Sequence, residues 1–495
     1  MKEKRFVLAR TRLLVPLSDA LGDDTRITDG YILTDGSQIK EVGRYTPQRG
    51  REIVDECGNE LLILGADPKD SYSEEDIPRL NGVALPGLIK CHGHDHESPI
   101  IGISKDEPLV DWLDHTVNMF TGFMDTRRDE LTERFGKSPN LIPYLKARLD
   151  DIHYGITSCL VNHTSFNKYR VDDLVAANLT AGSKMTIAVG SADQNYEPRV
   201  LETIEEAVER MDRYQEAFGG AERTEIIPGP DQIFSNSAGM LSALKKWASG
   251  YGKLVHVHSS EEPETTRWFT EQYGKTPIEM AHSAGFLDSY TLLAHQCNST
   301  DRDLEIIRDS GATVVHNPLA NTIIGDGMPP IIRMMEMGIP VVISTDGAGA
   351  ADNQNIINAA RLAAQYQKAY HRDATLLPSL TLLKMITVDA ARALRLNAGC
   401  LETGKDADFI ILDLTPSNLV PTRADNVIEN IIWAADGNEV QWMVANGLLL
   451  RDDYRAVRLD EKKIKQETQE LSELMIEFRD STEEIVATGI RSDQN

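Results

Sequence analysis

Histidine and acidic side chains recur at the ends of apolar segments in this 495-residue chain. The first group follows the segment 86–91 and holds two histidines two residues apart, His92 and His94. Alternate residues of a strand lie on one face, so both imidazoles can bind one metal ion from the same side. Further polar groups end apolar runs downstream, and they supply His258, His295 and Asp346.

Imidazoles that converge with one carboxylate are a donor set for a first-row divalent metal ion, with zinc expected and iron as the alternative. One coordination position stays open for water, whose pKa such an ion lowers to about 7. Barrels of eight β/α units place their chemistry at the carboxyl ends of their strands. Strand-like runs alternate with helical segments over residues 83–395, so the sequence predicts an α/β fold with a (β/α)8 TIM-like barrel.

An ordered set of motifs accompanies these residues. It comprises PGL-x-x-x-H-x-H at 86–94, H-x-x-E at 258–261, the isolated His295, HNPLAN at 316–321, STDG at 344–347 and GCLETGKDAD at 399–408. With this set the chain resembles the amidohydrolase superfamily, in its mononuclear deaminase and chlorohydrolase branch. That branch includes s-triazine hydrolases and S-adenosylhomocysteine/methylthioadenosine deaminases. The resemblance covers nearly the whole chain.

The constellation predicts a metal-dependent hydrolase that acts on carbon–nitrogen bonds other than peptide bonds. We expect one divalent ion on His92, His94, His258 and Asp346, with Asp346 also taking the proton of the attacking water. Glu261 is placed to protonate a ring nitrogen, and His295 to orient the water or polarise the leaving group. The expected reaction is hydrolytic deamination of an amino-substituted N-heterocycle of the purine, pyrimidine or s-triazine type, which makes the protein a cyclic amidine deaminase.

Several alternatives stay open. A chlorohydrolase or an amidohydrolase would use the same mononuclear site on C–Cl or other C–N bonds, and a catalytically silent binding barrel would need no turnover. A register that uses His94 and His96 would shift the first motif by two residues. His256 shares a strand face with His258 and is expected behind the site, while Glu262 is expected to be a solvated charge. A dinuclear site with a carboxylated lysine is disfavoured, because Lys184 starts its strand rather than ending it.

Substrate contacts are expected from Asp111, Trp112, His163 and Asn321. The resemblance implies that Asp111 and Trp112 match a loop whose acidic residue, usually Glu, holds ribose hydroxyls in nucleoside deaminases. The chain departs from the family pattern at Pro230-Asp231, where Pro-His is usual, and at Ala320, where serine is usual. These departures favour a small-molecule substrate different from adenosine-type nucleosides.

The acidic composition limits the kinds of partner. Asp and Glu outnumber Lys and Arg by 77 to 51, for a formal net charge of −26. Nucleic acids and anionic membrane surfaces need a basic face, so neither is an expected partner. The five cysteines have no paired spacing, which is typical of a reducing compartment. With no segment that looks like a signal peptide or a membrane span, we expect a cytoplasmic protein that can form homo-oligomers.

Four regions are expected along the chain. Residues 1–82 should form the N-terminal part of a β-sandwich, with a polar insertion at 66–81 and turns at the Asp-Gly pairs 29–30 and 35–36. Residues 83–395 should form the hydrolase barrel. Residues 396–460 should complete a composite N- plus C-terminal β-sandwich, as the resemblance implies. Residues 461–495 should be a helical tail that packs one apolar stripe on the rest of the protein.

Overall fold

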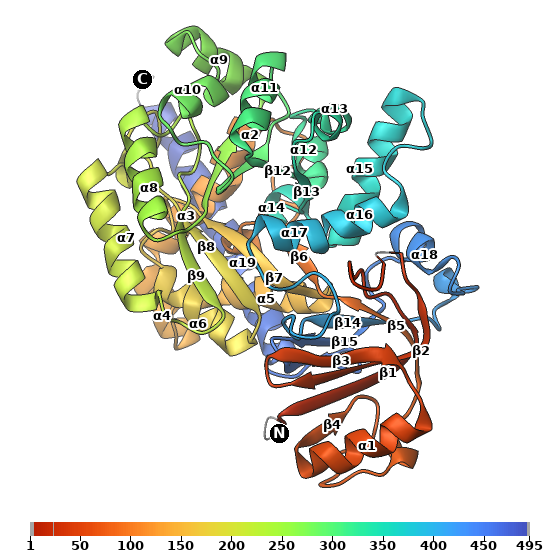
Figure 1. Cartoon of the computed structure of the whole chain (residues 1–495). Helices are drawn as coiled ribbons and strands as arrows, with labels where there is room; N and C mark the ends of the chain where they lie inside the picture. Colours follow the sequence, from red (N-terminus) through yellow and green to blue (C-terminus); the bar gives the residue numbers. More distant parts are fainter. Residues whose placement is uncertain (1–3, 23, 493–495) are drawn as a thin grey trace.

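Two four-stranded parallel sheets form the middle of the chain, within the residues 4–22 and 24–492 that the computed structural model describes. Both sheets follow the order of the sequence, β6-β7-β8-β9 and β10-β11-β12-β13 (Figure 1). The strands are β6 (Leu88–Lys90), β7 (Ile156–His163), β8 (Lys184–Val189), β9 (Thr224–Pro228), β10 (Val255–Ser259), β11 (Thr291–His295), β12 (Thr313–His316) and β13 (Val341–Ile343). Parallel strands joined by helical crossovers confirm the predicted α/β class.

Helices connect these strands and cover the sheets. Among them, α8 (Ala238–Gly250) buries Met240, Leu241 and Leu244 on its inner face. The other helices of this region are α2 (Leu109–Leu113), α3 (Met119–Thr126), α4 (Arg128–Phe135), α5 (Leu141–His153), α6 (Val171–Ala181), α7 (Ile204–Phe218), α9 (Pro263–Tyr273), α10 (Pro277–Ser283), α11 (Asp301–Ser310), α12 (Pro318–Ile324), α13 (Ile331–Glu336), α14 (Ala348–Ala351), α15 (Ile356–His371), α16 (Ser379–Met385) and α17 (Val388–Ala393). A π-helical turn, Asp114–Asn118, joins α2 to α3.

Strands from both ends of the chain share one sheet, which has nine strands in the described ranges. Its order is β17-β16-β15-β14-β5-β1-β2-β3, and β4 pairs with β1. The strands are β1 (Phe6–Leu14), β2 (Ile27–Asp35), β3 (Gln38–Arg44), β4 (Leu61–Ile63), β5 (Leu80–Pro86), β14 (Phe409–Asp413), β15 (Val440–Ala445), β16 (Leu448–Asp452) and β17 (Arg455–Ala456). The antiparallel pairing of β5 with β14 joins the N-terminal to the C-terminal part. Two further helices, α1 (Pro47–Cys57) and α18 (Val427–Trp433), flank this region (Figure 1).

Lys184 fixes the nine-stranded sheet to the parallel strands. Its ammonium group lies at the start of β8 and binds Asp406 at 2.5 Å and Asp408 at 2.8 Å. Both carboxylates belong to the 399–408 motif, so this motif has a structural role at the end of the strands that lies away from the histidines.

The Asp-Gly pair at 29–30 is not a turn, which corrects the sequence prediction. Both residues lie inside β2, where Thr11 pairs with Gly30 and Leu13 with Thr28. Asp29 adopts a φ of 51°, and its carboxylate binds Arg10 at 2.8 Å. A short acidic side chain tolerates this left-handed backbone, so the pair forms a local irregularity of a continuous strand instead of ending it.

The polar insertion 66–81 lies beside the nine-stranded sheet. It contains a short 3₁₀ helix, Glu74–Asp76, that begins with a capping box at Ser73. Lys69 and Tyr72 line a groove together with Leu448 and Leu449 of β16. The insertion therefore contacts the sheet, and in the described part of the chain none of its residues lines the cavity beside the histidines.

The C-terminal tail forms the long helix α19 (Glu461–Ser492), with side chains described as far as Ser481. Leu471 and Met475 are buried in one cluster with Phe123 of α3 and Ile142 of α5. The predicted apolar stripe thus packs on helices that surround the parallel strands (Figure 1). The predicted N-terminal and tail regions also include residues 1–3, 23 and 493–495, which lie outside the described residues. Among the described helices, none combines the length and the apolar character that a membrane span needs.

Candidate metal centre and active site

The histidines and the aspartate selected from the sequence converge at the carboxyl ends of the parallel strands. His92 Nε2 lies 3.0 Å from Asp346 Oδ1, and His94 Nε2 lies 3.4 Å from the same oxygen. The Nε2 atoms of His94 and His258 are 3.2 Å apart. Donor atoms of His92, His258 and His295 also lie within 4.8 Å of one another. The strand-end residues His295 and Asp346 adopt positive φ angles of 74° and 71°, a strained conformation that is common at functional sites.

The second ring nitrogens show which tautomers the site contains. His94 Nδ1 donates to the Asn162 carbonyl at 3.0 Å, and His258 Nδ1 donates to the Asp231 carbonyl. Because Nδ1 carries the proton in both rings, the two Nε2 atoms face each other as lone pairs. Lone pairs 3.2 Å apart repel unless a cation lies between them, so these rings fit a metal ion.

His92 is supported in a different way, by another histidine. Its Nδ1 lies 3.0 Å from His256 Nε2, and His256 Nδ1 lies 3.2 Å from the Asn162 side-chain amide. With the Asn162 amide nitrogen donating to His256 Nδ1, His256 Nε2–H donates to His92 Nδ1. His92 Nε2 is free for a metal ion when the Asn162 amide is turned over, because its oxygen then accepts from His256 Nδ1 and His92 Nδ1 donates to His256. His256 therefore lies behind the cluster, as the sequence predicted, and orients His92.

His295 has the opposite tautomer. Its Nδ1 accepts a hydrogen bond of 2.8 Å from the Asn321 amide, which also donates to Asp326 Oδ2 at 3.2 Å. The proton of His295 is consequently on Nε2, which lies 3.4 Å from Glu261 Oε1 and 3.8 Å from Asp346 Oδ2. This N–H can orient a water or a leaving group, whereas the other rings offer lone pairs.

Burial and neighbouring charges set the protonation states. Burial lowers the pKa of His92 and His258 well below the usual range and also lowers that of His94, so these rings are neutral at pH 7. Burial alone would raise the pKa of Asp346, but the interactions with His92 and the other histidines hold it well below its usual range. The cluster therefore combines neutral imidazoles with an ionised carboxylate, the states that bind a divalent cation.

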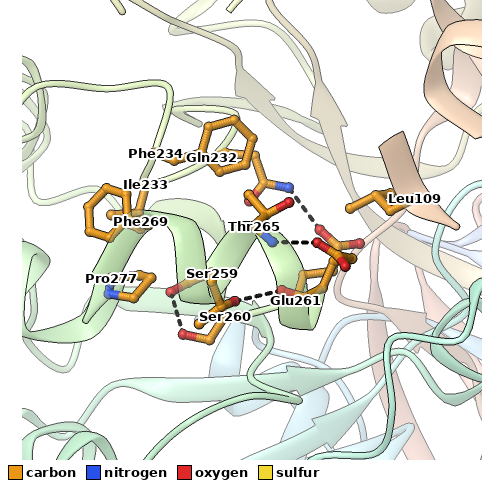
Figure 2. Close-up of a pocket in the computed structure, with 12 residues that line it drawn as sticks. Leu109, Gln232, Ile233, Phe234, Ser259, Ser260, Glu261, Thr265, Phe269 and Pro277 are labelled. Carbon is orange, nitrogen blue, oxygen red and sulfur yellow. Dashed lines mark hydrogen bonds between the residues drawn. The ribbon is translucent and has the colours of Figure 1, made fainter. Parts of the chain in front are cut away.

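Glu261 is a buried carboxyl group that retains its proton near neutral pH. Burial, followed by the charge of Asp346, raises its pKa to about 8. The Gln232 side-chain amide donates to Glu261 Oε2 at 2.8 Å and fixes the direction of the carboxyl group (Figure 2). A protonated carboxyl beside a metal-type cluster can act as a general acid.

Glu97 packs close to the loop that carries Asp346. Its carboxylate accepts hydrogen bonds from the backbone N–H groups of Gly349 at 3.1 Å and Ala350 at 3.4 Å. A Cβ atom on Gly347 would approach Glu97 Oε2 to 2.0 Å. The glycine of the STDG motif is thus required for this close contact, which supports the turn after Asp346.

The four residues expected to contact substrate have different surroundings. Trp112 is buried and lines the cavity beside the histidines, whereas Asp111 is exposed on the same short helix. Asn321 contacts His295 and Asp326. His163 is buried with its ring 5.7 Å from that of Tyr144, and it is not among the described residues that line the cavity. The roles of these four residues stay predictions.

The remaining sequence alternatives have clear positions. His96 lines the cavity, but His92 and His94 are the pair that groups with Asp346. Glu262 is buried rather than solvated, which corrects the prediction. Its carboxylate caps α9 by accepting the N–H groups of Glu264 and Thr265. An N-cap accepts hydrogen bonds from backbone N–H groups that have no partner within the helix, so this carboxylate stabilises the start of α9.

Sequence reasoning missed Asp326, Gln232 and Glu97. Asp326 lies with Glu261 and His295 in one group of donor atoms within 4.8 Å, and burial followed by the charge of Glu261 raises its pKa to about 8. An acidic residue between two glycines, 325–327, was the available signal. Gln232 directly follows Pro230-Asp231, a place already marked by its departure from the expected pattern.

Comparison with known proteins agrees with this geometry. The model of the amidohydrolase family matches residues 83–449, which span the parallel strands and the site. The chain belongs to the amidohydrolase family. A 5-methylthioadenosine/S-adenosylhomocysteine deaminase of Thermococcus kodakarensis is 30% identical over 87% of this chain and 91% of the relative. A 5'-deoxyadenosine deaminase of Methanosarcina mazei is 27% identical over 92% of this chain and 98% of the relative.

Solved structures show the same fold for this amidohydrolase. An adenosine deaminase from Xanthomonas campestris with bound zinc has a TM-score of 0.79 at 18% identity and covers 95% of this chain and 98% of its own. An atrazine chlorohydrolase from Arthrobacter aurescens complexed with zinc also reaches 0.79, at 22% identity, with 94% of this chain and 100% of its own covered. At these identities the likeness concerns the fold.

Proposed function

We propose that this amidohydrolase is a metal-dependent hydrolytic deaminase of an amino-substituted N-heterocycle. One observation carries the proposal: a carboxyl group with a pKa of about 8, Glu261, lies beside three neutral imidazoles and an ionised carboxylate. Deaminases named for adenosine-type purines are among the relatives that match most of the chain, which supports the same reaction class.

One divalent ion would be held by His92, His94, His258 and Asp346. Nitrogen and oxygen donors in this number favour zinc, and zinc is also present in the two solved relatives named above. When bound, the ion supplies a water of lowered pKa and polarises the reacting carbon–nitrogen bond. The facing Nε2 lone pairs of His94 and His258 are the feature of this chain that fits such an ion.

The protein side chains then have separate tasks. Asp346 accepts a proton from the attacking water at the carboxylate oxygen nearer His295. Glu261, directed by Gln232, donates its proton to the ring nitrogen next to the carbon under attack. The His295 N–H hydrogen-bonds the oxygen that adds to this carbon. As the adduct collapses to the carbonyl, its hydroxyl proton returns to Glu261, and ammonia leaves with the proton from Asp346 completing the leaving group.

Loss of chloride or of an alkylamine is the second candidate, because the same residues activate water for both reactions. Glu261 favours deamination, since an amine leaves only after protonation whereas chloride leaves as the anion. The discriminating experiment measures ammonia release by zinc-loaded protein across aminopurines, aminopyrimidines, adenosine derivatives and amino-s-triazines. Release that Glu261→Gln abolishes supports the deaminase. No ammonia from any compound, with chloride released from a chloro-s-triazine, would contradict it.

The finer architecture is part of the proposal. We take the two parallel sheets to close into a (β/α)8 barrel over residues 83–395. Gln232 and His258 form a parallel bridge at one junction, and Ser344 Oγ exchanges hydrogen bonds with the backbone of His92 at the other. Residues 1–82 and 396–460 would form the composite β-sandwich, which the shared core of strands from both segments supports. Residues 461–495 would be the tail.

A further inference from the structure

The ligand cluster opens into a cavity of about 80 Å³. By the measure in which one water needs roughly 10–15 Å³, the space holds several waters, which suits a heteroaromatic base better than a larger conjugate. Four aromatic side chains line it, namely Trp112, Phe166, Tyr196 and Phe234. The ring of Tyr196 lies 5.7 Å from that of Phe166 and 6.4 Å from that of Phe234. Such a row of rings favours a flat ligand that packs on aromatic faces.

Apart from the Tyr196 phenol, the ionisable groups that line the cavity are carboxyl groups and imidazoles. Its ionisable acids are Glu97, Asp231, Glu261 and Asp346, and among the described lining residues there is neither lysine nor arginine. A divalent ion at Asp346 would be the one strong positive charge beside the described lining residues. An anionic substituent elsewhere in the cavity would be buried without a compensating cation, which is unfavourable.

The lysine and arginine side chains near the cavity bind carboxylates and backbone carbonyls outside it. Lys168 donates to the Val200 carbonyl at 2.6 Å and lies 3.2 Å from Glu202. Arg210 also binds Glu202, at 2.6 Å. Lys105 donates to the Gly349 carbonyl at 2.8 Å and pairs with Asp352 at 2.9 Å. None of these three side chains is among the described lining residues, so they stabilise the surrounding loops and do not contact a ligand in the cavity.

The Asp231 carboxylate has hydrogen-bond acceptor positions that no described group uses. Its carboxylate oxygens lie 3.0 and 2.8 Å from the single backbone N–H of Ser165. A carboxylate offers about four acceptor positions, and the side chain is only 2% exposed while lining the cavity. A ligand N–H would therefore find a desolvated acceptor at the position where the family motif usually has histidine.

We propose that the substrate is an amino-heterocycle with a second N–H donor, bound by Asp231, besides the amino group that leaves, and with no phosphate or carboxylate. This inference rests on the proposed function and narrows its substrate class. It makes Asp231 the residue that determines specificity. A ring lacking the second donor leaves acceptor positions of a buried carboxyl group unused, and a phosphorylated ring finds no lysine or arginine among the described lining residues to compensate its charge.

The test uses matched ligands and binding as its readout. Zinc-loaded Glu261→Gln protein, which should bind without turnover, is titrated with 9-methyladenine, 2,6-diamino-9-methylpurine, adenosine and adenosine 5'-monophosphate. The methyl group removes the ring N–H, so the first two ligands differ only in the 2-amino donor. We expect 2,6-diamino-9-methylpurine to bind at least ~10-fold more tightly than 9-methyladenine and the monophosphate to bind at least ~10-fold more weakly than adenosine. The second variant combines Glu261→Gln with Asp231→Leu and should bind 9-methyladenine and 2,6-diamino-9-methylpurine alike. Adding Asp231→Asn instead, which retains one acceptor oxygen, should keep part of the preference.

A control variant combines Glu261→Gln with Glu262→Gln, since the Glu262 carboxylate caps α9 and is not among the described residues lining this cavity. It should keep the full preference. Zinc content is measured for each protein, because the Asp231 backbone carbonyl supports His258. Equal binding of adenosine and its monophosphate, or an undiminished preference in the Asp231→Leu protein, would overturn the inference. Failure of the proposed function is seen separately, as wild-type protein that binds these ligands and releases no ammonia.

Discussion

Two buried polar clusters lie close together in this molecule and differ in how their charges are compensated. In the first, Lys90 binds Asp151 at 2.8 Å, while Arg148 binds Asp95 at 2.7 Å and Asp151 at 2.9 Å. In the second, the imidazoles of His94 and His258 face each other with lone pairs, and Glu261 keeps its proton because it is buried beside the charge of Asp346.

The difference separates a structural cluster from a functional one. Two cations and two carboxylates within ion-pairing distance compensate one another, so the Lys90–Arg148 cluster is complete without a ligand. The histidine cluster becomes electrostatically favourable only when a cation binds. Its strained backbone at His295 and Asp346 indicates the same, because such conformations persist where the surrounding structure imposes them for function.

The largest expected effect follows from removing a ligand. His94→Ala should reduce bound zinc and ammonia release to background, because one of the facing imidazoles is lost. Zinc per chain is measured by mass spectrometry after dialysis, next to activity. His115→Ala is the matched control, since this histidine is 60% exposed and pairs with Glu107. Full zinc content in His94→Ala would show that the cluster is not the metal centre.

Glu261→Gln should have opposite effects on activity and on stability. Activity should fall by roughly 10²–10⁴-fold, the contribution of a positioned general acid. The pKa of Glu261 is about 4.5 in the unfolded chain and about 8 in the folded protein. Between these pH values unfolding releases a proton, so Glu261 lowers the free energy of unfolding increasingly as pH rises towards 8. The metal-free variant should then gain up to about 4 kcal/mol at pH 8 and little at pH 4. Urea unfolding at both pH values measures this, and a stability change independent of pH would contradict it.

Lys90→Met tests the complete cluster. Without Lys90, the Asp151 carboxylate keeps only Arg148 as a cationic partner among the described residues of this cluster. We expect a loss of about 3 kcal/mol in the free energy of unfolding, because a buried charge loses one of its partners. The double variant Lys90→Met, Asp151→Leu should recover part of this loss. Zinc content should stay at the wild-type level in every variant that folds. Loss of zinc from a folded variant would erase the distinction between the two clusters.

The smallest effect is expected at Asn321. Asn321→Ala removes the amide that donates to His295 Nδ1 and so frees the ring to change its tautomer. We expect a decrease of about 10-fold in kcat with an unchanged zinc content and little change in KM. Thr322→Ala, one residue along the same helix, is the control because its hydroxyl donates to the backbone of α12. A decrease in zinc content would instead place His295 among the metal ligands.

The sequence predicted the elements that carry the cluster more completely than the contacts that tune it. Apolar runs that end in His258 or His295 are local patterns, and a parallel sheet brings such ends together. The carboxyl of Asp326 comes from a loop with no periodicity, and its closeness to Glu261 depends on how α12 leads into the following glycines. The Asp29-Gly30 pair misled in the other direction, because pairing with β1 overrode a local turn signal. Burial of Glu262 as a helix cap also depends on tertiary packing.

The most direct test of the account is a zinc titration of ammonia release. Chelator-treated protein receives increasing equivalents of zinc, and the rate is followed with an amino-heterocycle that the wild type deaminates. The account predicts no activity without metal and a plateau at one equivalent per chain, with Glu261→Gln binding the same single equivalent and remaining inactive. Activity that persists in the metal-free protein, or a plateau that needs two equivalents, would contradict a mononuclear centre at His92, His94, His258 and Asp346.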